Sequence, residues 1–394
     1  MEKAKISSLK KTYEKELFEN VMPFWERVAP DYEYGGILHN VDRDGSLISS
    51  DKCGWFQGRG TWVFSRLYND FGRKPIWLEI AKLGYDFINK HCFDLDGRMF
   101  FELKQDGRPI RKRRYWFTEA FSVIAMAEYG KAAGDSEALQ KARDLYDKIV
   151  FYFRNPGILP AKYIPQNFQI KAHNTRMIML GTTQIMRDMD PLNTEKYDDI
   201  LLSVCNELYR DFYKPDMQLF LEYVDPRGEF VDNPIGRRLS PGHTIESMWF
   251  VLLEAERHKN NDLKQMALNA ILWSMDRGWD KEYGGLFNYI DAMGKPSDKL
   301  EWDMKTWWQH SEALYALLLA HHLTGEKKFE DLFDMMHEYT FKAFPDYEYG
   351  EWFGYLHRDG SICLPVKGSM FKGPFHIPRA LMYCIKLLEK MENT

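Results

Sequence analysis

Apolar residues recur at helical spacing along most of this chain of 394 residues. Residues three and four positions apart share one face of an α-helix, so such runs predict amphipathic helices. We expect an N-terminal helix over about residues 4–27. Further helices are expected at 60–71, 76–91, 118–133, 136–153, 175–189, 198–212, 243–258, 262–273, 307–323, 328–344 and 379–391.

Short aromatic-rich segments that end in a glycine turn separate many of these helices. Alternating apolar residues followed by Asp-Gly or a related turn are typical of β-hairpins. The turn glycines are Gly45, Gly107, Gly228, Gly294 and Gly360. Their spacings are 62, 121, 66 and 66 residues, and the long interval is about twice the others. A sixth, divergent unit is therefore expected near residues 157–171.

The order of these elements predicts a closed architecture. About two helices accompany each repeat, and the N-terminal helix completes the last pair. Six helix pairs joined by hairpins describe an all-α fold, an (α/α)6 barrel or toroid with short β-hairpins at one end. An open solenoid should end in polar capping repeats, whereas the last unit here is as aromatic as the first. With no linker-like segment, residues 1–394 are expected to form a single (α/α)6-barrel catalytic domain.

Composition and charge narrow the partners that we expect. The net charge is −5 and no Lys/Arg block is present, so no nucleic acid partner is expected. Apolar runs fall short of about 18 residues and the N-terminus lacks an apolar signal segment, so neither membrane association nor secretion is expected. The five cysteines are scattered without a CxxC pair, which argues against a disulfide framework. A cytoplasmic location follows as the expectation.

Polar residues of several kinds recur at one phase of the repeat, at the start of the first helix after each hairpin. In a closed barrel these helix starts would surround one mouth and bring distant residues into one pocket. Helix starts favour polar residues in any protein, so the shared phase is not by itself proof of function. The candidates are Arg59, Glu119, Asn174, His243, Glu312 and His376.

His243 lies in the first turn of its expected helix, after Ser240 as N-cap and Pro241 at the first helical position. The positive end of the helix favours a neutral imidazole, while Glu246 on the same face favours the protonated form. A histidine near neutrality suits proton transfer. The plainer interpretation is a core helix whose histidine only satisfies a hydrogen bond.

His376 also opens a helix, because Pro378 suits its first turn. The alternative is a loop histidine packed on its aromatic neighbour. His310 and Glu312 are two residues apart on one helix, so they cannot face the same way. We therefore assign Glu312 to the pocket and His310 either to packing or to the support of pocket residues. Aromatic residues ring these helix starts, and Trp308 among them is expected to contact the substrate.

Metal and dinucleotide sites are not expected from the spacing of residues. No cluster of His, Asp, Glu or Cys has metal-ligand spacing in the sequence, so we expect no metal. A Rossmann fingerprint and a phosphate loop of the GxxxxGK type are likewise absent from the sequence.

Several long motifs make the chain similar to a known family. They are Gln57-Gly-Arg59, Ser240-Pro-Gly-His-Thr-Ile-Glu246, Leu300-Glu-Trp-Asp-Met-Lys305, His310-Ser-Glu-Ala313 and Phe371-Lys-Gly-Pro-Phe-His-Ile-Pro-Arg379. Over nearly its whole length the chain resembles the N-acylglucosamine 2-epimerase family, also known through the renin-binding protein of mammals. The C-terminal motif is the most specific part of this resemblance.

The resemblance implies an (α/α)6 barrel that interconverts N-acetylglucosamine and N-acetylmannosamine. It carries two essential histidines onto His243 and His376. It also carries an arginine and a glutamate of the substrate pocket onto Arg59 and Glu312. Related cellobiose 2-epimerases and aldose–ketose isomerases have a further histidine where this chain has Ile178, which favours the N-acyl-sugar branch.

Asn174 and Arg176 depart from that branch, so the exact sugar stays open. Some family members respond to ATP, and activation of this chain by ATP or another nucleotide stays open as well. The chemistry itself requires no cofactor. The expected partner is a small-molecule amino sugar, and a homodimer is a candidate assembly.

The chemistry of the candidate residues agrees with the resemblance. Inversion beside an aldehyde needs ring opening, removal of the C2 proton and its return on the other face, a task that His243 and His376 can share. Arg59 would stabilise the enolate oxygen. Glu246 would orient and tune His243, and Glu312 would hold sugar hydroxyls or assist ring opening.

Other functions remain compatible with these residues. An aldose–ketose isomerase, or a cellobiose- or mannose-type 2-epimerase, would use the same barrel. A glycoside hydrolase would use Glu119 and Glu312 as its pair of carboxyl groups. A binding protein without catalytic activity is the remaining alternative.

Overall fold

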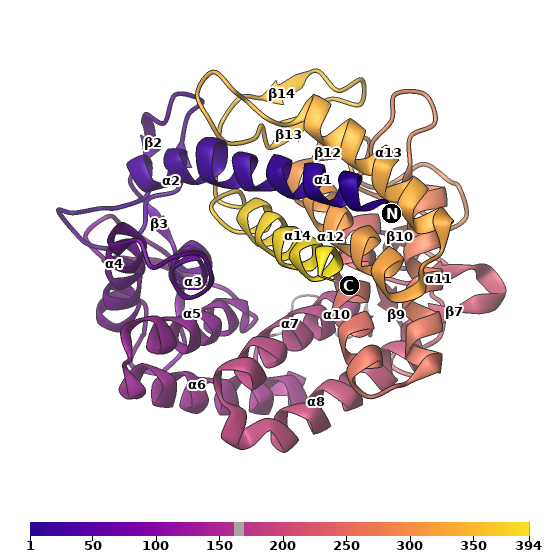
Figure 1. The fold of residues 1–394 in the computed structure, drawn as a ribbon. Coiled ribbons are helices and arrows are strands. Elements are labelled where there is room, and N and C mark those ends of the chain that lie inside the picture. The colour runs from indigo at the N-terminus through magenta and orange to yellow at the C-terminus, as the bar shows by residue number, and fades with distance from the viewer. Residues whose placement is uncertain (161–168, 394) are drawn as a thin grey trace.

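A computed structural model describes residues 1–160 and 169–393 of the chain. Its long helices form two concentric rings (Figure 1). The inner ring consists of α3 (Gly54–Asp70), α5 (Phe117–Ala133), α7 (His173–Met189), α10 (Pro241–Arg257), α12 (Trp307–Thr324) and α14 (His376–Glu392). Their outer partners are α4 (Pro75–His91), α6 (Ser136–Arg154), α8 (Thr194–Glu207), α11 (Asn261–Gly278), α13 (Lys327–Ala343) and, for α14, the N-terminal α1 (Lys3–Lys15).

The inner ring is closed. Each inner helix contacts the next one in sequence, and α14 packs back against α3. The first and last long helices, α1 and α14, also pack together, so the two ends of the chain lie side by side (Figure 1). The predicted all-α (α/α)6 barrel is therefore confirmed, and the open solenoid is wrong. The assignment of residues 1–394 to one domain stays a prediction.

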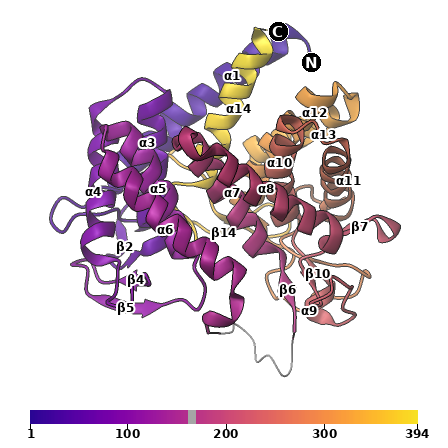
Figure 2. The same cartoon turned by 90° about the horizontal axis from the view of Figure 1, so that it is seen from below.

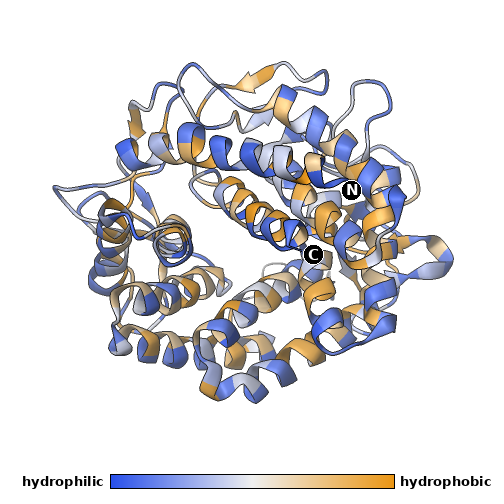
Figure 3. Ribbon diagram, in the orientation of Figure 1, coloured by the Kyte–Doolittle hydropathy of each residue, from blue (hydrophilic) through white to orange (hydrophobic). Residues whose placement is uncertain are grey.

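The sequence of each helix matches its place in the rings. The inner helix α5 is buried on all sides from Phe117 to Gly130, whereas the outer helix α6 buries one stripe that includes Ala138, Ala142 and Leu145. A helix between two layers needs apolar or small residues all round, and a surface helix needs one apolar face. Figure 3 shows the outer helices banded with hydrophilic and hydrophobic residues.

Some helix boundaries differ from the prediction. The N-terminal helix passes through a π-helical segment, η1 (Glu16–Val21), before α2 (Met22–Val28). The helix α3 begins at Gly54 and α14 begins at His376, both earlier than predicted. Arg59 therefore lies in the second turn of its helix, because the strand before α3 leads directly into it.

Short antiparallel strands gather at one end of the barrel, and both termini lie at the other (Figure 2). Several strands that precede an inner helix pair with a strand of a later hairpin, which fixes the start of that helix. The pairs of this kind are β3 (Lys52–Cys53) with β4 (Phe100–Leu103), β6 (Lys171–Ala172) with β9 (Tyr223–Val224), β10 (Arg238–Leu239) with β11 (Ile290–Asp291), and β12 (Lys305–Thr306) with β13 (Tyr355–Leu356).

The predicted glycine turns are present, but not all of them close hairpins. All the predicted turn glycines have positive φ, for example 90° at Gly45 and 91° at Gly107, a conformation that side chains oppose. Two-stranded hairpins form around three of them, with β1 (Asn40–Val41) and β2 (Leu47–Ser49), β4 and β5 (Pro109–Lys112), and β13 and β14 (Ile362–Leu364). The remaining described hairpin joins β7 (Tyr213–Lys214) and β8 (Leu219–Phe220). The divergent unit expected near 157–171 lies partly outside the described residues.

The same buried ion pair between a lysine and an aspartate occurs at three places at this end of the barrel. Each lysine pairs with the aspartate that opens an Asp-x-Glu-Tyr-Gly loop, and the lysine side chains are fully buried. The N–O distances are 2.7 Å for Lys52–Asp31, 3.0 Å for Lys305–Asp280 and 2.9 Å for Lys367–Asp346. These ion pairs tie the loops to the hairpin end, where the inner helices begin. Across residues 1–160 and 169–393, no helix has the length and hydrophobicity needed to span a membrane.

Candidate active site

The first histidine of the site, His243, lies in the first turn of α10 as predicted. The Ser240 hydroxyl oxygen accepts the backbone N–H of His243 at 3.5 Å, and Pro241 occupies the first helical position. Nδ1 of His243 lies 3.0 Å from Oε1 of Glu222, in the segment between β8 and β9. Burial opposes ionisation of Glu222, but the charges and hydrogen bonds of the histidines beside it outweigh that effect and lower its pKa.

The prediction that Glu246 orients His243 is wrong. The carboxylate of Glu246 accepts a hydrogen bond from Arg379 on α14, and Glu222 takes the position beside the imidazole. The reason is electrostatic: a guanidinium is a permanent cation, whereas an imidazole carries a positive charge only when it is protonated, so the guanidinium is the better partner for a buried carboxylate. Glu222 reaches His243 from the short segment between β8 and β9.

A second histidine that the sequence analysis missed holds the other side of Glu222. His173 is fully buried, with Nδ1 3.4 Å from Oε2 of Glu222 and Nε2 2.5 Å from the hydroxyl of Ser247. The backbone N–H of His173 also donates to the carbonyl oxygen of Glu222 at 2.9 Å. The predicted candidate was the next residue, Asn174, which is half-buried. The shared phase of helix starts pointed to this place but selected the neighbouring residue.

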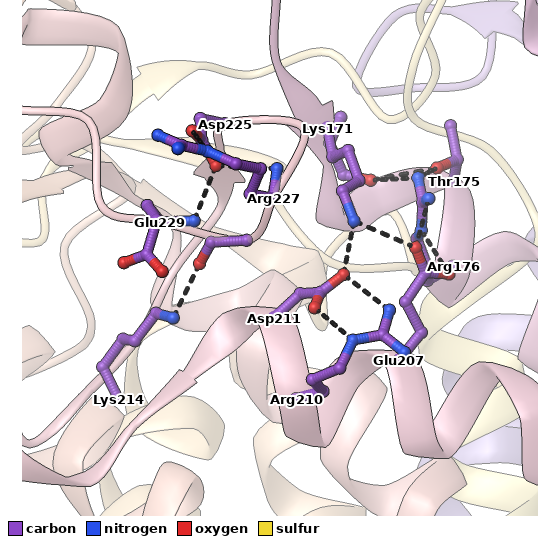
Figure 4. Close-up of polar contacts among 12 residues, drawn as sticks. Lys171, Thr175, Arg176, Glu207, Arg210, Asp211, Lys214, Asp225, Arg227 and Glu229 are labelled. Atoms are coloured by element: carbon purple, nitrogen blue, oxygen red, sulfur yellow. Dashed lines mark hydrogen bonds and ion pairs between the residues drawn. The ribbon is translucent and has the colours of Figure 1, made fainter.

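Figure 4 shows ion pairs of Lys171 and Arg176, two residues around the start of α7. Lys171 contacts Asp211, and Arg176 donates to Glu207 at 2.7 Å. Glu207 is the last residue of α8, and Asp211 lies in the π-helical segment η4 (Leu208–Phe212) that follows it. Because these contacts lie two residues before and three residues after His173, they limit the movement of its ring relative to Glu222.

The third histidine, His376, begins α14 and binds a different carboxylate. Its Nδ1 lies 2.9 Å from Oε1 of Glu312, and Nη2 of Arg379 lies 2.5 Å from the same oxygen. The indole N–H of Trp249 donates to Oε2 of Glu312 at 2.9 Å. Burial lowers the pKa of His376 well below its ordinary value; Glu246 opposes this shift, and the positive charge of Arg379 adds to it.

Two groups of the described residues have metal-like geometry that the sequence spacing did not reveal. One is Asp198, Glu254 and His258, where Arg187 bonds to both carboxylates. The other lies in the site. Ligand atoms of Glu246, Glu312 and His376 all lie within 4.8 Å of one another. The guanidinium of Arg379 stands among them and bonds to both carboxylates. A divalent ion would therefore have to displace an arginine that already supplies the positive charge, so these residues fit an arginine better than a metal. The absence of a catalytic metal stays a prediction.

Trp308 links the two catalytic candidates. Its ring centroid lies 5.1 Å from that of His243 and 5.8 Å from that of His376. Both histidines therefore flank one indole, and both turn Nδ1 toward a carboxylate. The two rings therefore have the same orientation relative to their carboxylates.

Arg59 is buried among aromatic rings. Its guanidinium carbon lies 4.1 Å from the ring centroid of Phe121 and 4.8 Å from that of Phe375, and Nε has no hydrogen-bond partner among the described residues. Burial lowers the pKa of Arg59 to about 10, although the negative charge of Glu246 opposes that shift. A buried cation with an unused donor is suited to stabilise an anion that forms during a reaction.

A cavity of about 630 Å³ fills the lumen toward the carboxyl ends of the inner helices. Arg59, Glu246 and Arg379 contribute to its lining, together with apolar residues such as Ile178, and neither His243 nor His376 does. The histidines stand one turn nearer the amino ends of their helices. The charged layer of Arg59, Glu246 and Arg379 therefore has the histidines on one side and this cavity on the other.

Glu119 does not join the site. It is fully buried, and Oε1 accepts hydrogen bonds from Nε of Arg98 at 2.5 Å and from the backbone N–H of Met99 at 3.1 Å. Its role is thus to anchor the neighbouring hairpin. With Glu119 bonded to Arg98 and Glu312 bonded to Arg379, the predicted carboxyl pair of a glycoside hydrolase is not supported.

His310 has the packing role that was predicted for it. Nε2 accepts the backbone N–H of Leu286 at 2.9 Å, and Nδ1–H donates to the carbonyl oxygen of Thr306 at 2.7 Å. Burial lowers the pKa of His310 to about 3, so the ring stays neutral. Its neighbour Glu312 faces the lumen, as expected from their separation on the helix.

Comparisons with known proteins identify the family and the fold. The profile of the family described as N-acylglucosamine 2-epimerase (GlcNAc 2-epimerase) matches residues 36–377. The N-acylglucosamine 2-epimerase of Rattus norvegicus is 35% identical over 376 residues, which cover 94% of this chain and 90% of that protein. Cellobiose 2-epimerase from Bacillus thermoamylovorans B4167 has a similar structure, with a TM-score of 0.83, 21% identity, and coverage of 98% of this chain and 100% of that one. A D-mannose isomerase also superimposes with a TM-score of 0.83, at 17% identity over 96% of this chain and 98% of its own.

Proposed function

This chain belongs to the N-acylglucosamine 2-epimerase family, and we propose that it interconverts N-acetylglucosamine and N-acetylmannosamine by passing protons through His243 and His376. The observation that carries this mechanism is the paired arrangement of the two histidines. Each binds a carboxylate through Nδ1, and both flank Trp308. Two proton carriers at one site are what inversion of a carbon centre requires.

The reaction begins with the open-chain form of the sugar. The aldehyde at C1 makes the C2 proton acidic, and one neutral histidine removes that proton through Nε2. The C–H electron pair moves into the C1–C2 bond, and the carbonyl oxygen becomes an enolate oxygen. The other histidine, as imidazolium, then donates its proton to the opposite face of C2, and the carbonyl re-forms. One proton enters and one leaves, so no redox change occurs.

Arg59 is the group best suited to stabilise the enolate oxygen. Its burial strengthens its interaction with a developing charge, and its Nε is not committed to another described residue. Glu312 and Glu246 share Arg379, which keeps their charges compensated beside the substrate. We assign them to the hydroxyl groups of the sugar. None of these steps calls for a metal or an organic cofactor, and nucleotide activation stays outside the chemical step.

The surroundings of the cysteines support a reducing compartment. All five cysteines are free thiols, and four of them are buried. Free cysteines are typical of proteins in the cytoplasm. We therefore propose that the enzyme acts there on a small amino sugar, and we retain a homodimer as the candidate assembly.

Proton NMR of N-acetylmannosamine incubated with the enzyme in D2O tests the proposed function. The expected result is formation of N-acetylglucosamine with deuterium at C2 and with no ketose. Accumulation of a ketose would identify an isomerase instead. Absence of both epimer and C2 exchange with either N-acetylhexosamine would overturn the proposal.

A further inference from the structure

The two catalytic histidines have carboxylate partners with different charge compensation. Glu312 is held by Arg379 and His376, whereas Glu222 is held by His243 and His173. A carboxylate that bonds to an arginine has a permanent cation beside it, although Glu312 shares this cation with Glu246. A carboxylate that bonds only to imidazole rings gains a compensating cation when one of those rings takes up a proton.

The surroundings of His376 disfavour a proton on its ring. Nη2 of Arg379 lies 3.4 Å from Nδ1 of His376, and the charges of Arg59 and His243 act on the ring as well. Glu246 and Glu312 supply negative charge, but both are bonded to Arg379. An imidazolium at this position would be an additional buried cation beside an arginine.

The surroundings of Glu222 favour a proton on one of its two histidines. His243 and His173 are the groups whose charges act most strongly on Glu222, and Tyr289 lies near enough to interact with it. His173 is completely buried, whereas 26% of the His243 side chain is exposed. Hydration stabilises a charged ring, and the His243 ring has water access that the His173 ring lacks.

We infer that Glu222, held in place by His173, whose Nε2 bonds to Ser247, puts the resting proton on His243, so that His376 is the neutral base for the epimer whose C2 proton faces it. This inference rests on the proposed two-histidine mechanism. Glu222 is then a positioning residue, since it acts through His243. The catalytic cycle would begin with one imidazolium and one neutral ring. During one inversion the neutral ring gains a proton and the imidazolium loses one, so the two rings exchange protonation states.

Direct titration of the histidines tests this inference on the unmodified enzyme. The enzyme is labelled with 13C at histidine Cε1, and the His243→Asn and His173→Gln variants assign the signals. At neutral pH the His243 signal is expected at the imidazolium position and the His376 signal at the neutral position. A neutral His243 in the resting enzyme would overturn the inference, even if the enzyme epimerises its substrate normally.

Substitution of Glu222 gives a second and kinetic test. Glu222→Gln removes the charge and keeps the shape, so the imidazolium should lose its proton at a lower pH. The alkaline limb of the kcat/KM profile is expected to move down by about one pH unit or more. Glu222→Asp keeps the charge, so it should leave that limb in place even if kcat falls. Glu229→Gln is the matched control, because Glu229 lies in the same turn region but is exposed.

A purely structural role for Glu222 would lower kcat without moving the pH profile or the His243 titration. That result would contradict the inference. His173→Gln separates the charge of Glu222 from its positioning. The variant removes the histidine that holds Glu222, while the carboxylate remains. It is expected to broaden the His243 signal and lower kcat, with the alkaline limb near its original position.

Discussion

Nη2 of Arg379 lies 2.5 Å from Oε1 of Glu312, and both side chains are buried in the lumen of the barrel. The same carboxylate oxygen lies 2.9 Å from Nδ1 of His376. The carboxylate of Glu312 thus binds both a permanent cation, Arg379, and a titratable ring, His376. Because Arg379 also bonds to Glu246, it compensates two carboxylates that would otherwise be buried without a full positive charge.

Replacement of Arg379 should therefore damage stability as well as activity. In Arg379→Met, two buried carboxylates lose their cation, and we expect the free energy of unfolding to fall by about 3–5 kcal/mol. We also expect kcat to fall by at least about 100-fold, since His376 would gain a proton more readily. Urea unfolding and initial rates measure the two effects. Arg379→Lys keeps the charge and should recover part of both, and equal losses in the two variants would argue against the charge as the cause.

Arg59 should behave in the opposite way with respect to stability. It is buried, and its Nε has no partner in residues 1–160 and 169–393. Arg59→Met therefore removes a desolvated charge, and the free energy of unfolding should stay the same or rise. Both kcat and kcat/KM should fall together by about 10²–10³-fold, because the interaction is made with the enolate. Steady-state kinetics at one pH measures this. A rise in KM with an unchanged kcat would instead place Arg59 in ground-state binding.

Burial of His310 should make the free energy of unfolding depend on pH. Its pKa is lowered from 6.5 to about 3 in the folded protein. Between these values the unfolded chain binds a proton that the folded chain does not, so stability falls as the pH falls. This group alone contributes about 1.4 kcal/mol per pH unit over that window.

The His310→Gln variant checks this sign, since glutamine can keep one donor and one acceptor for Leu286 and Thr306. The slope of unfolding free energy against pH between pH 6 and 4 should be shallower in the variant than in the unmodified protein. His357→Gln, at an exposed position, serves as the control and should leave the slope unchanged. Parallel slopes for His310→Gln and the unmodified protein would contradict the account.

The fold was predictable because it repeats. Helical periodicity and the glycine turns locate the helix pairs, and positions such as Gly45 and Gly107 have the positive φ that the turns require. His243 and His376 could also be predicted from the sequence, because helix starts in a closed barrel converge on one end. The carboxylates that bind these histidines could not be predicted from local sequence patterns.

Glu222 illustrates the limit. It lies in an extended segment 21 residues before His243 in the sequence, and its contact depends on the path of the chain between β8 and β9. Helical spacing pointed instead to Glu246, whose charge is better satisfied by Arg379 across the lumen. Likewise Glu119 had the expected phase, but the nearby Arg98 provides a stronger partner than any substrate group. Competition among charged partners decides such contacts, and it operates only once the tertiary structure exists.

The most direct test of the two-histidine account is C2 exchange in D2O with His243→Asn and His376→Asn, each supplied separately with N-acetylmannosamine and N-acetylglucosamine. The account predicts that both variants lose net epimerisation. It also predicts that a variant which retains activity exchanges the C2 proton of one epimer only, because the remaining histidine can remove and return a proton on its own face. Net epimerisation by either variant at a rate near that of the unmodified enzyme would contradict the account.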